Sequence, residues 1–259
     1  MSALDYTIRF LGTGTSIGIP VPGCPCSVCH SKDWRNHRSR SSIIIEKEGY
    51  RALIDTTPEF RFQALRSKIN SLDAVFWTHA HADHLHGIDD LRGLTWNRPI
   101  PGYANPSTTQ EIHRRFDYLW KNTQRGGGKA RINLHEVNKD QSIHVGPLEF
   151  TPLPVLHGQL PIYGWRCGPI AYITDVSQIP TETYERLENL ELLILGALRF
   201  KEHPTHFSVH RALEEVKKIR PKRAYFTHIS HEASHRELRR RTPAHVNPAR
   251  DGLRLRVKG

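Results

Sequence analysis

Residues 79–84 read His79-Ala80-His81-Ala82-Asp83-His84 and place three imidazoles and one carboxylate within six positions. All are good ligands for a borderline divalent metal such as zinc. In an extended segment His79 and His81 point to the same side, whereas Asp83 and His84 are adjacent and diverge, so one ion is not expected to hold all four. The alternative is a helix that starts near Asp83 with solvated histidines around it, but this does not explain four ligand-type residues in six positions. The string therefore predicts a site for two ions.

The composition is that of an ordinary globular protein of 259 residues. Hydrophobic residues make up 37% of the chain, which is enough for a sizeable core, and no apolar segment is long enough to cross a membrane. Residues 1–9 lack the basic start and apolar stretch of a signal peptide. We therefore expect a single domain over residues 1–259, in the cytoplasm and without a membrane partner.

The chain carries a formal net charge of +11, which draws anions such as phosphorylated metabolites, nucleic acid or acidic protein surfaces. Basic residues are frequent between Arg236 and Lys258, but no aromatic residue interleaves there to stack single-stranded bases. A solvated face is the preferred interpretation of that region. The charge agrees with a small anionic substrate without selecting one.

Short β-branched and aromatic runs alternate with helix-like stretches and show no repeat, which predicts one mixed α/β domain. Candidate strands occupy residues 6–11, 42–46, 52–55, 74–78, 148–154, 170–174, 192–195, 223–227 and 253–257. Candidate helices occupy residues 59–67, 83–91, 107–120, 181–190, 208–219 and 231–241. Residues 123–131, with three consecutive glycines, are predicted to form a flexible loop.

Five apolar runs each end in a residue of metal-ligand type. These residues are Asp55, His79, His157, Asp175 and His228. Ligand crevices in α/β proteins lie outside the carboxyl ends of strands, so we expect these five side chains to converge although they are far apart in the sequence. One strand that ends in histidine means little, but five such endings support a metal site independently of the string at 79–84.

The predicted ligands divide into two sets by geometry. His79, His81 and His157 hold one ion, Asp83, His84 and His228 hold the other, and Asp175 bridges both. Two ions roughly 3.5–4 Å apart lower the pKa of a shared water, and the bridging hydroxide attacks the substrate at neutral pH. Asp55 is expected to accept a hydrogen bond from a ligand imidazole. Zinc or manganese is the expected metal, although iron and nickel suit the same ligands.

The string from Thr78 to His84 resembles the signature of the metallo-β-lactamase superfamily, and Asp55, His157, Asp175 and His228 occupy its other motifs in order. The resemblance runs from Leu11 to about His231. It implies a four-layer αβ/βα sandwich with the dinuclear site at one edge. Members include lactamases, thioesterases, lactonases, phosphodiesterases and RNA-processing nucleases, so the family does not fix the reaction.

Cys24, Cys26 and Cys29 supply three thiolates within six residues, and a tetrahedral zinc needs one further ligand. His231, three residues after His228, is the best candidate, and three free buried thiols are the alternative. This cluster and the preceding run from Leu11 to Thr15 look like those of PhnP-type phosphodiesterases, in which a Cys3His structural zinc is implied near the active site. Cys167 stands alone and is predicted to be filler.

His206 lies where PhnP-type and RNA-processing relatives carry a histidine that faces the substrate phosphate, so that role is implied by the resemblance. An imidazolium there would stabilise the transition state and protonate the leaving alkoxide. His203 and His210 are alternatives, a solvated helix-start histidine remains open, and Ser208 is the expected helix cap. His206 and Asp83 are thus the predicted catalytic residues.

The leading hypothesis is hydrolysis of a phosphodiester, specifically a small cyclic phosphate of a ribosyl or nucleotide compound. The stretches Asp55–Arg61 and Gly87–Arg92 depart from the PhnP-type pattern and leave the substrate open; Arg61 and Arg92 either contact a phosphate or pair with neighbouring acids. One rival is tRNA 3′-end processing, for whose RNA-gripping arm only residues 121–147 leave room.

Two other rivals are hydrolysis of a lactone or thioester, which needs no phosphate-facing histidine, and a nucleic-acid-binding module with structural metal. Seven potential dinuclear ligands argue against the last of these. A small anionic phosphodiester is therefore the expected partner, nucleic acid is less favoured, and a homodimer is left open.

Overall fold

The computed structural model describes residues 5–122 and 128–259. Its strands are β1 (Tyr6–Gly12), β2 (Ser42–Lys47), β3 (Tyr50–Ile54), β4 (Ala74–Phe76), β5 (Ile100–Ala104), β6 (Ile132–Glu136), β7 (Ile143–Val145), β8 (Leu148–His157), β9 (Leu160–Cys167), β10 (Ile170–Ile173), β11 (Leu192–Gly196), β12 (Arg223–Thr227), β13 (Val246–Pro248) and β14 (Arg254–Val257). Its α-helices are α1 (Phe60–Ser67), α2 (Ala82–Leu85), α3 (Pro106–Arg115), α4 (Thr181–Tyr184), α5 (Val209–Ile219) and α6 (His235–Arg241). Short 3-10 turns are η1 (Trp34–Asn36), η2 (Ile88–Leu94), η3 (Asp117–Leu119) and η4 (Glu185–Leu187).

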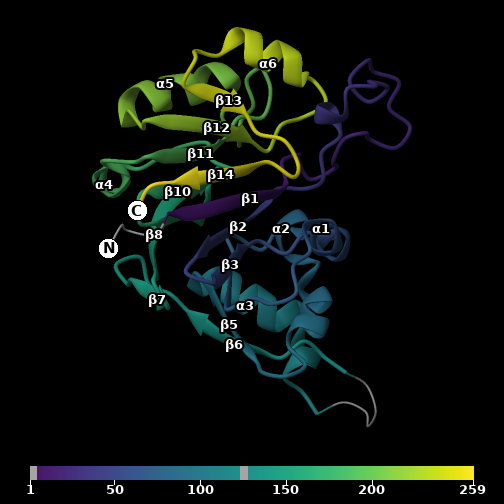
Figure 1. Ribbon diagram of the computed structural model, residues 1–259, viewed down its shortest axis with the longest axis vertical. Coiled ribbons are helices and arrows are strands. Elements are labelled where there is room, and N and C mark those ends of the chain that lie inside the picture. The colour runs from purple at the N-terminus through teal and green to yellow at the C-terminus, as the bar shows by residue number, and fades with distance from the viewer. Residues whose placement is uncertain (1–4, 123–127) are drawn as a thin grey trace.

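The strands form two seven-stranded mixed sheets, in the orders β14-β1-β2-β3-β4-β5-β6 and β13-β12-β11-β10-β9-β8-β7. Strands β3 to β6 run parallel in the first sheet, and β10 to β13 run parallel in the second. Helices α1, α2 and α3 lie against the first sheet, and α5 and α6 cover the second (Figure 1). The predicted four-layer αβ/βα sandwich of the α/β class is therefore confirmed.

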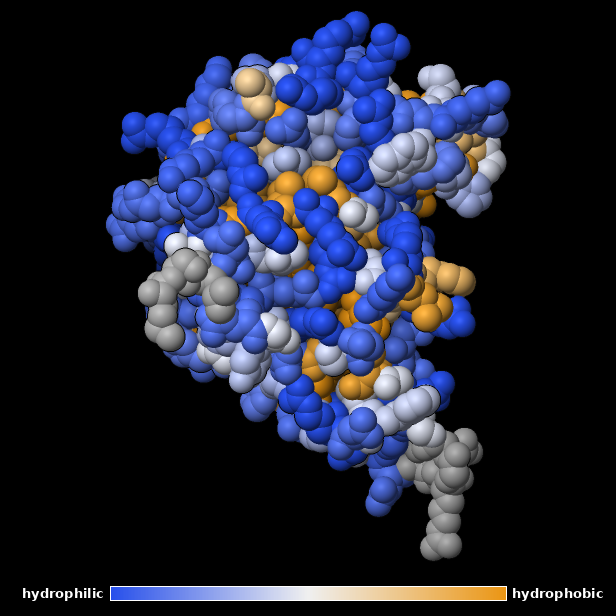
Figure 2. All heavy atoms as spheres, viewed as in Figure 1, coloured by the Kyte–Doolittle hydropathy of each residue, from blue (hydrophilic) through white to orange (hydrophobic). Residues whose placement is uncertain are grey.

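Three apolar layers hold the sheets and helices together, because successive side chains of a strand face opposite sides. In β11, Leu192 and Ile194 pack between the two sheets, whereas Leu193 and Leu195 pack under the helices of the second sheet. The visible face in Figure 2 is mostly hydrophilic, with hydrophobic side chains in small patches. None of the described helices is long and apolar enough to cross a membrane.

The predicted helix over 83–91 is wrong as a single element, because it divides into α2 and the 3-10 turn η2. Gly87 lies between them against the loop that follows β3, where a Cβ atom would come within 1.9 Å of the Thr57 carbonyl oxygen. The helix predicted to begin at His231 begins instead at His235, after the Ser234 cap. Asp83 and His84 therefore lie in the short helix α2, whereas His231 lies in the turn before α6.

Strands β5 and β9 were not predicted from the sequence, because proline and glycine interrupt their apolar patterns. Gly102 of β5 lies under the Trp77 ring, where a Cβ atom would come within 2.6 Å of a ring carbon. Strand β9 forms a long hairpin with β8, in which His157 pairs with Leu160. Strands β6, β7 and β13 were also not predicted. Of the loop predicted over 123–131, residues 123–127 lie outside the described residues.

Candidate metal centre

Three of the strand-end residues adopt the left-handed backbone conformation. Their φ angles are 67° at Asp55, 51° at Asp175 and 54° at His228. Positive φ is uncommon for residues with a side chain, costs of order 1–3 kcal/mol, and clusters at functional sites. The ends of β3, β10 and β12 thus carry backbone strain at the edge where their polar residues meet.

The first group of ligand-type side chains contains His79, His81 and His157, whose nearest ring nitrogens lie within 4.8 Å of one another. Residues between β4 and α2 supply the first two, and β8 supplies the third. The ring centroids of His81 and His157 are 5.1 Å apart, and those of His79 and His81 are 4.5 Å apart. His79 is buried while His81 is exposed, so the group opens to solvent at one side.

The second group contains Asp83, His84, Asp175 and His228, and all four residues are buried. Asp175 Oδ2 lies 3.2 Å from His84 Nε2, and Asp175 Oδ1 lies 3.2 Å from His228 Nε2. Asp83 Oδ2 lies 3.1 Å from His84 Nε2. Asp175 also groups with His157 and His206, so its carboxylate lies between the two groups.

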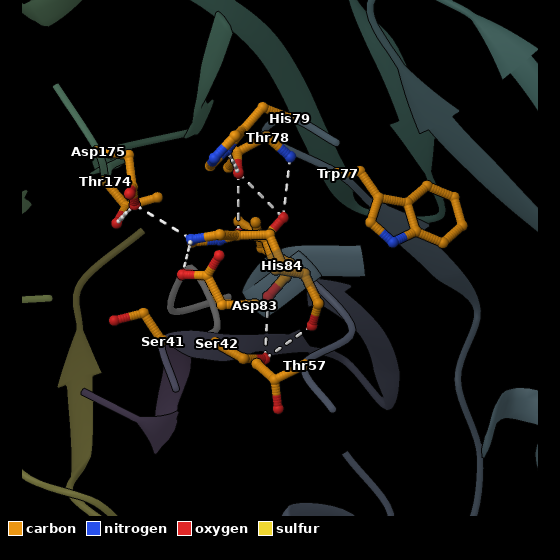
Figure 3. A network of polar contacts seen from close by, with 12 residues as sticks. Ser41, Ser42, Thr57, Trp77, Thr78, His79, Asp83, His84, Thr174 and Asp175 are labelled. Carbon is orange, nitrogen blue, oxygen red and sulfur yellow. Dashed lines mark hydrogen bonds and ion pairs between the residues drawn. The ribbon is translucent and has the colours of Figure 1, made fainter. Parts of the chain in front are cut away.

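Asp55 organises the ring nitrogens beneath this site. Figure 3 shows Thr78, His79, Asp83, His84 and Asp175 in this network of polar contacts. His84 Nδ1 donates to Asp55 Oδ2 at 2.7 Å, which leaves Nε2 directed at Asp83 and Asp175. Thr78 Oγ1 donates to the same carboxylate and accepts a bond from His79 Nδ1 at 3.0 Å. One buried carboxylate therefore orients an imidazole in each group, so that Nδ1 is held below the site and Nε2 faces it.

Thr78 and Thr205 were not singled out from the sequence. The Nδ1 atom of His157 donates to the Thr205 carbonyl oxygen at 2.7 Å, which leaves Nε2 of this imidazole free as well. A backbone carbonyl leaves no trace in the sequence, whereas Thr78 was recognisable as the residue before the histidine string. These partners hold the imidazoles in one tautomer.

The charges of the second group depend on one another. Burial alone would raise the pKa of the Asp175 carboxyl, but the imidazoles of His228 and His84 outweigh it and hold that pKa well below its usual range. The same holds for the Asp83 carboxyl. Burial would raise its pKa, but the imidazoles of His84 and His228 have the larger, opposite effect and lower it. Both carboxylates are ionised at neutral pH, as metal ligation requires.

Several buried nitrogens have no hydrogen-bond partner among the described residues. They include His79 Nε2 and both ring nitrogens of His228. Buried polar atoms are normally paired, and an unpaired atom points to a missing ion or water. Ionised carboxylates and imidazoles whose Nε2 atoms face the site are the donor set that two divalent cations take, one for each group.

His206 lies beside both groups. Its ring centroid is 5.0 Å from that of His228 and 4.6 Å from that of His157, and its Nδ1 is 3.7 Å from Asp175 Oδ1. Burial, together with the nearby His228 imidazole, lowers the pKa of His206 to about 3. Of the alternatives, His203 has its ring centroid 5.1 Å from that of His206, and His210 is exposed and lies 3.4 Å from Glu214. Ser208 caps α5 by accepting a bond from the Arg211 amide.

The cysteine cluster closes around His231. Its Nδ1 lies 3.2 Å from Cys24 Sγ and 3.4 Å from Cys26 Sγ, and all four ligand atoms, that of Cys29 included, are within 4.8 Å of one another. The Cys29 amide and His231 lower the pKa of Cys26 to about 6, whereas burial raises the pKa of Cys29 to about 11. Three thiols and one imidazole in this arrangement fit a tetrahedral zinc. Cys167 is buried between the two sheets as core filling.

The two candidate phosphate-binding arginines are held by other partners. Arg92 donates from Nη1 to the Gly128 carbonyl oxygen at 3.0 Å, and the Arg61 guanidinium lies over the Phe62 ring, 5.4 Å from its centroid. Neither residue belongs to the groups of ligand-type side chains. Nothing in their contacts favours a role in substrate binding.

A family model described as the beta-lactamase superfamily domain matches residues 50–229. A solved structure described as a new diphosphatase from the PhnP family superposes with a TM-score of 0.91 at 41% sequence identity. The match covers 98% of this chain and 97% of that one. The fold and the sequence of this chain are therefore both similar to those of the PhnP family.

Curated relatives also match in sequence. An octanoyltransferase of Porphyromonas gingivalis is 40% identical over 246 residues, which cover 94% of this chain and 50% of that protein. A ribonuclease Z of Bradyrhizobium diazoefficiens is 29% identical over 168 residues, which cover 62% of this chain and 49% of that protein. The chain thus spans about half the length of the curated relatives it matches.

Proposed function

This chain belongs to the metallo-β-lactamase superfamily, in its PhnP-type branch, and we propose that it is a metal-dependent phosphodiesterase acting on a small substrate, a cyclic phosphate of a ribosyl or nucleotide compound. The observation that carries the proposal is the Asp175 carboxylate between two groups of ligands, with His206 beside it. The PhnP-family diphosphatase supports a phosphorus–oxygen bond as the target.

The proposed ligands of one ion are His79, His81 and His157, those of the other are Asp83, His84 and His228, and Asp175 is shared between them. Zinc or manganese suits this donor set. When bound, the two cations supply a water of lowered pKa and screen the negative charge of the phosphoryl group. Asp55 contributes by keeping the imidazoles of His79 and His84 in the ligating tautomer.

His206 and Asp83 are the proposed catalytic residues. Because its pKa is lowered to about 3, His206 is neutral at pH 7 in the free protein and approaches the phosphate as a hydrogen-bond donor from one ring nitrogen. An anionic phosphodiester favours protonation of this imidazole, which then delivers the proton to the leaving oxygen. The ionised Asp83 carboxylate accepts a hydrogen bond from the attacking water and orients it.

The described residues favour a small substrate over tRNA. The described part of 121–147, the only stretch with room for an RNA-gripping arm, contributes β6 and β7, which pair with β5 and β8 at the ends of the two sheets. Strands β6 and β7 are therefore edge strands of the sandwich, and most of the described part of this stretch is used to build the sheets. The charge of +11 then serves to draw a small anion to the site.

The activity is tested with bis(p-nitrophenyl) phosphate, a chromogenic phosphodiester. We expect the metal-loaded protein to release p-nitrophenol, a chelator to stop the release, and added zinc or manganese to restore it. Absence of turnover under every metal tried would contradict the proposal. Turnover that survives exhaustive chelation would contradict its metal dependence.

Cys26→Ser tests the structural zinc, which we propose to be bound by Cys24, Cys26, Cys29 and His231. Wild-type protein is expected to hold about three metal ions per chain, two at the dinuclear site and one in the cysteine cluster, and the variant about two. Metal analysis after gel filtration measures the difference. Cys167→Ala, a thiol buried in the core, is the matched control and should leave the count unchanged. An unchanged count in Cys26→Ser would refute the structural zinc.

A further inference from the structure

A pocket of about 310 Å³ lies beside the first group of histidines, where His79, His81 and the intervening Ala80 form one wall. Helix α3 forms a second wall with Ser107, Glu111 and Arg115. The start of β9, three residues after His157, forms the third with Leu160 and Pro161. The pocket therefore adjoins the candidate metal centre. Its volume is at the lower end of the range for small-molecule sites, about 300–1,000 Å³.

The three walls are tied to one another. Arg115 donates from Nη1 to the Ala80 carbonyl oxygen at 2.6 Å, which joins the end of α3 to the histidine string. Asn105, the cap of α3, donates from Nδ2 to the Pro161 carbonyl oxygen at 3.4 Å. The pocket is thus preformed, which lowers the entropic cost of binding a ligand.

The lining carries balanced charge although the protein is strongly basic. The Glu111 carboxylate and the Arg115 guanidinium form an ion pair at 2.6 Å, and about one third of each side chain stays exposed, 32% and 31% respectively. Ala80, Leu160 and Pro161 supply apolar surface, and Ser107 supplies a hydroxyl. Such a lining suits an uncharged ring that has apolar faces and hydrogen-bonding edges.

We propose that this pocket binds the heterocyclic base of a nucleoside carried by the phosphodiester substrate. The inference rests on the proposed function and narrows its substrate to nucleotide compounds. A second phosphoryl group would have to compete with the Glu111 carboxylate, which already pairs with the Arg115 guanidinium. An alkyl chain would cover Ser107, Glu111 and Arg115 without replacing their hydrogen bonds to water.

The substrate test compares two esters with the same leaving group and charge: thymidine 5′-(p-nitrophenyl phosphate) and methyl p-nitrophenyl phosphate. Wild-type protein is expected to have the lower KM for the thymidine ester. Leu160→Trp or Ser107→Phe, either of which fills the pocket, should raise that KM about tenfold or more and leave kcat/KM for the methyl ester within about twofold. Leu65→Trp, at an exposed position of α1, is the matched control.

Two results would contradict base binding in this pocket: equal KM values for the two esters in wild-type protein, or equal effects of the filling variants on both esters. Either result would leave the phosphodiesterase proposal intact. Calorimetric titration of the metal-loaded protein with thymidine provides a readout that does not need turnover. Binding that is lost in Leu160→Trp and kept in Leu65→Trp is expected. No binding of thymidine, or equal binding by all variants, would overturn the inference even if neither ester is cleaved.

Discussion

Asp175→Ala is expected to lose both active-site ions and to lower kcat/KM for a phosphodiester by more than about 10³-fold, beyond the 10–100-fold typical of groups that only orient ligands. The physical reason is the position of the Asp175 carboxylate. One of its oxygens lies 3.2 Å from His84 Nε2 and the other 3.2 Å from His228 Nε2. The same carboxylate also lies within 4.8 Å of a ring nitrogen of His157. No neighbouring carboxylate belongs to both groups of described ligands. Its removal therefore weakens both sites at once.

Metal analysis and thermal unfolding measure this effect without turnover. A ligand that binds only the folded state stabilises it, so added zinc should raise the Tm of metal-free wild-type protein and raise that of Asp175→Ala much less. Asp140→Ala removes an exposed carboxylate paired with Arg186 and is the matched control. Two active-site ions retained at unchanged affinity in Asp175→Ala would contradict the shared role of Asp175.

For a phosphodiester with an alkoxide leaving group, His206→Ala is expected to lower kcat by about 10²–10⁴-fold, the range of general acid catalysis, while two active-site ions remain bound. His206 contacts both groups through His157, Asp175 and His228, yet no proposed ligand depends on it for its tautomer. Its loss therefore removes proton delivery to the leaving oxygen and leaves the ligands in place.

A leaving-group series separates proton delivery from a structural role. The defect of His206→Ala should be largest for an alkoxide leaving group and small for p-nitrophenolate, which departs without a proton. His210→Ala, an exposed histidine on α5 with 78% of its side chain accessible, is the matched control. An equal loss for all leaving groups would remove His206 from proton transfer, and full activity would remove it from the mechanism.

Much of the fold and of the site's composition was predictable, because apolar strands that end in histidine or aspartate bring distant residues to one sheet edge. Asp55, Asp175 and His228 were found in this way, and the family resemblance supplied the layers. The left-handed backbone at these three residues was not predictable, since none is glycine. Strand β5 escaped because its packing against Trp77, and not its local pattern, decides its conformation.

The pocket beside His79 and His81 was also invisible in the sequence. Its walls come from three separate segments, and the link from Arg115 to the Ala80 carbonyl oxygen involves a backbone atom that no residue pattern reveals. Local patterns therefore located the residues of metal-ligand type. The three-dimensional packing was needed to show what surrounds them.

The most direct test of the central claim is a comparison of kcat/KM for one metal-loaded preparation on a nucleoside cyclic phosphate, a lactone and an octanoyl thioester. The thioester is included because one relative, of which this chain spans half the length, is an octanoyltransferase. The account predicts that the cyclic phosphate has the highest kcat/KM and that chelation abolishes its hydrolysis. A higher kcat/KM for the lactone or the thioester would contradict it.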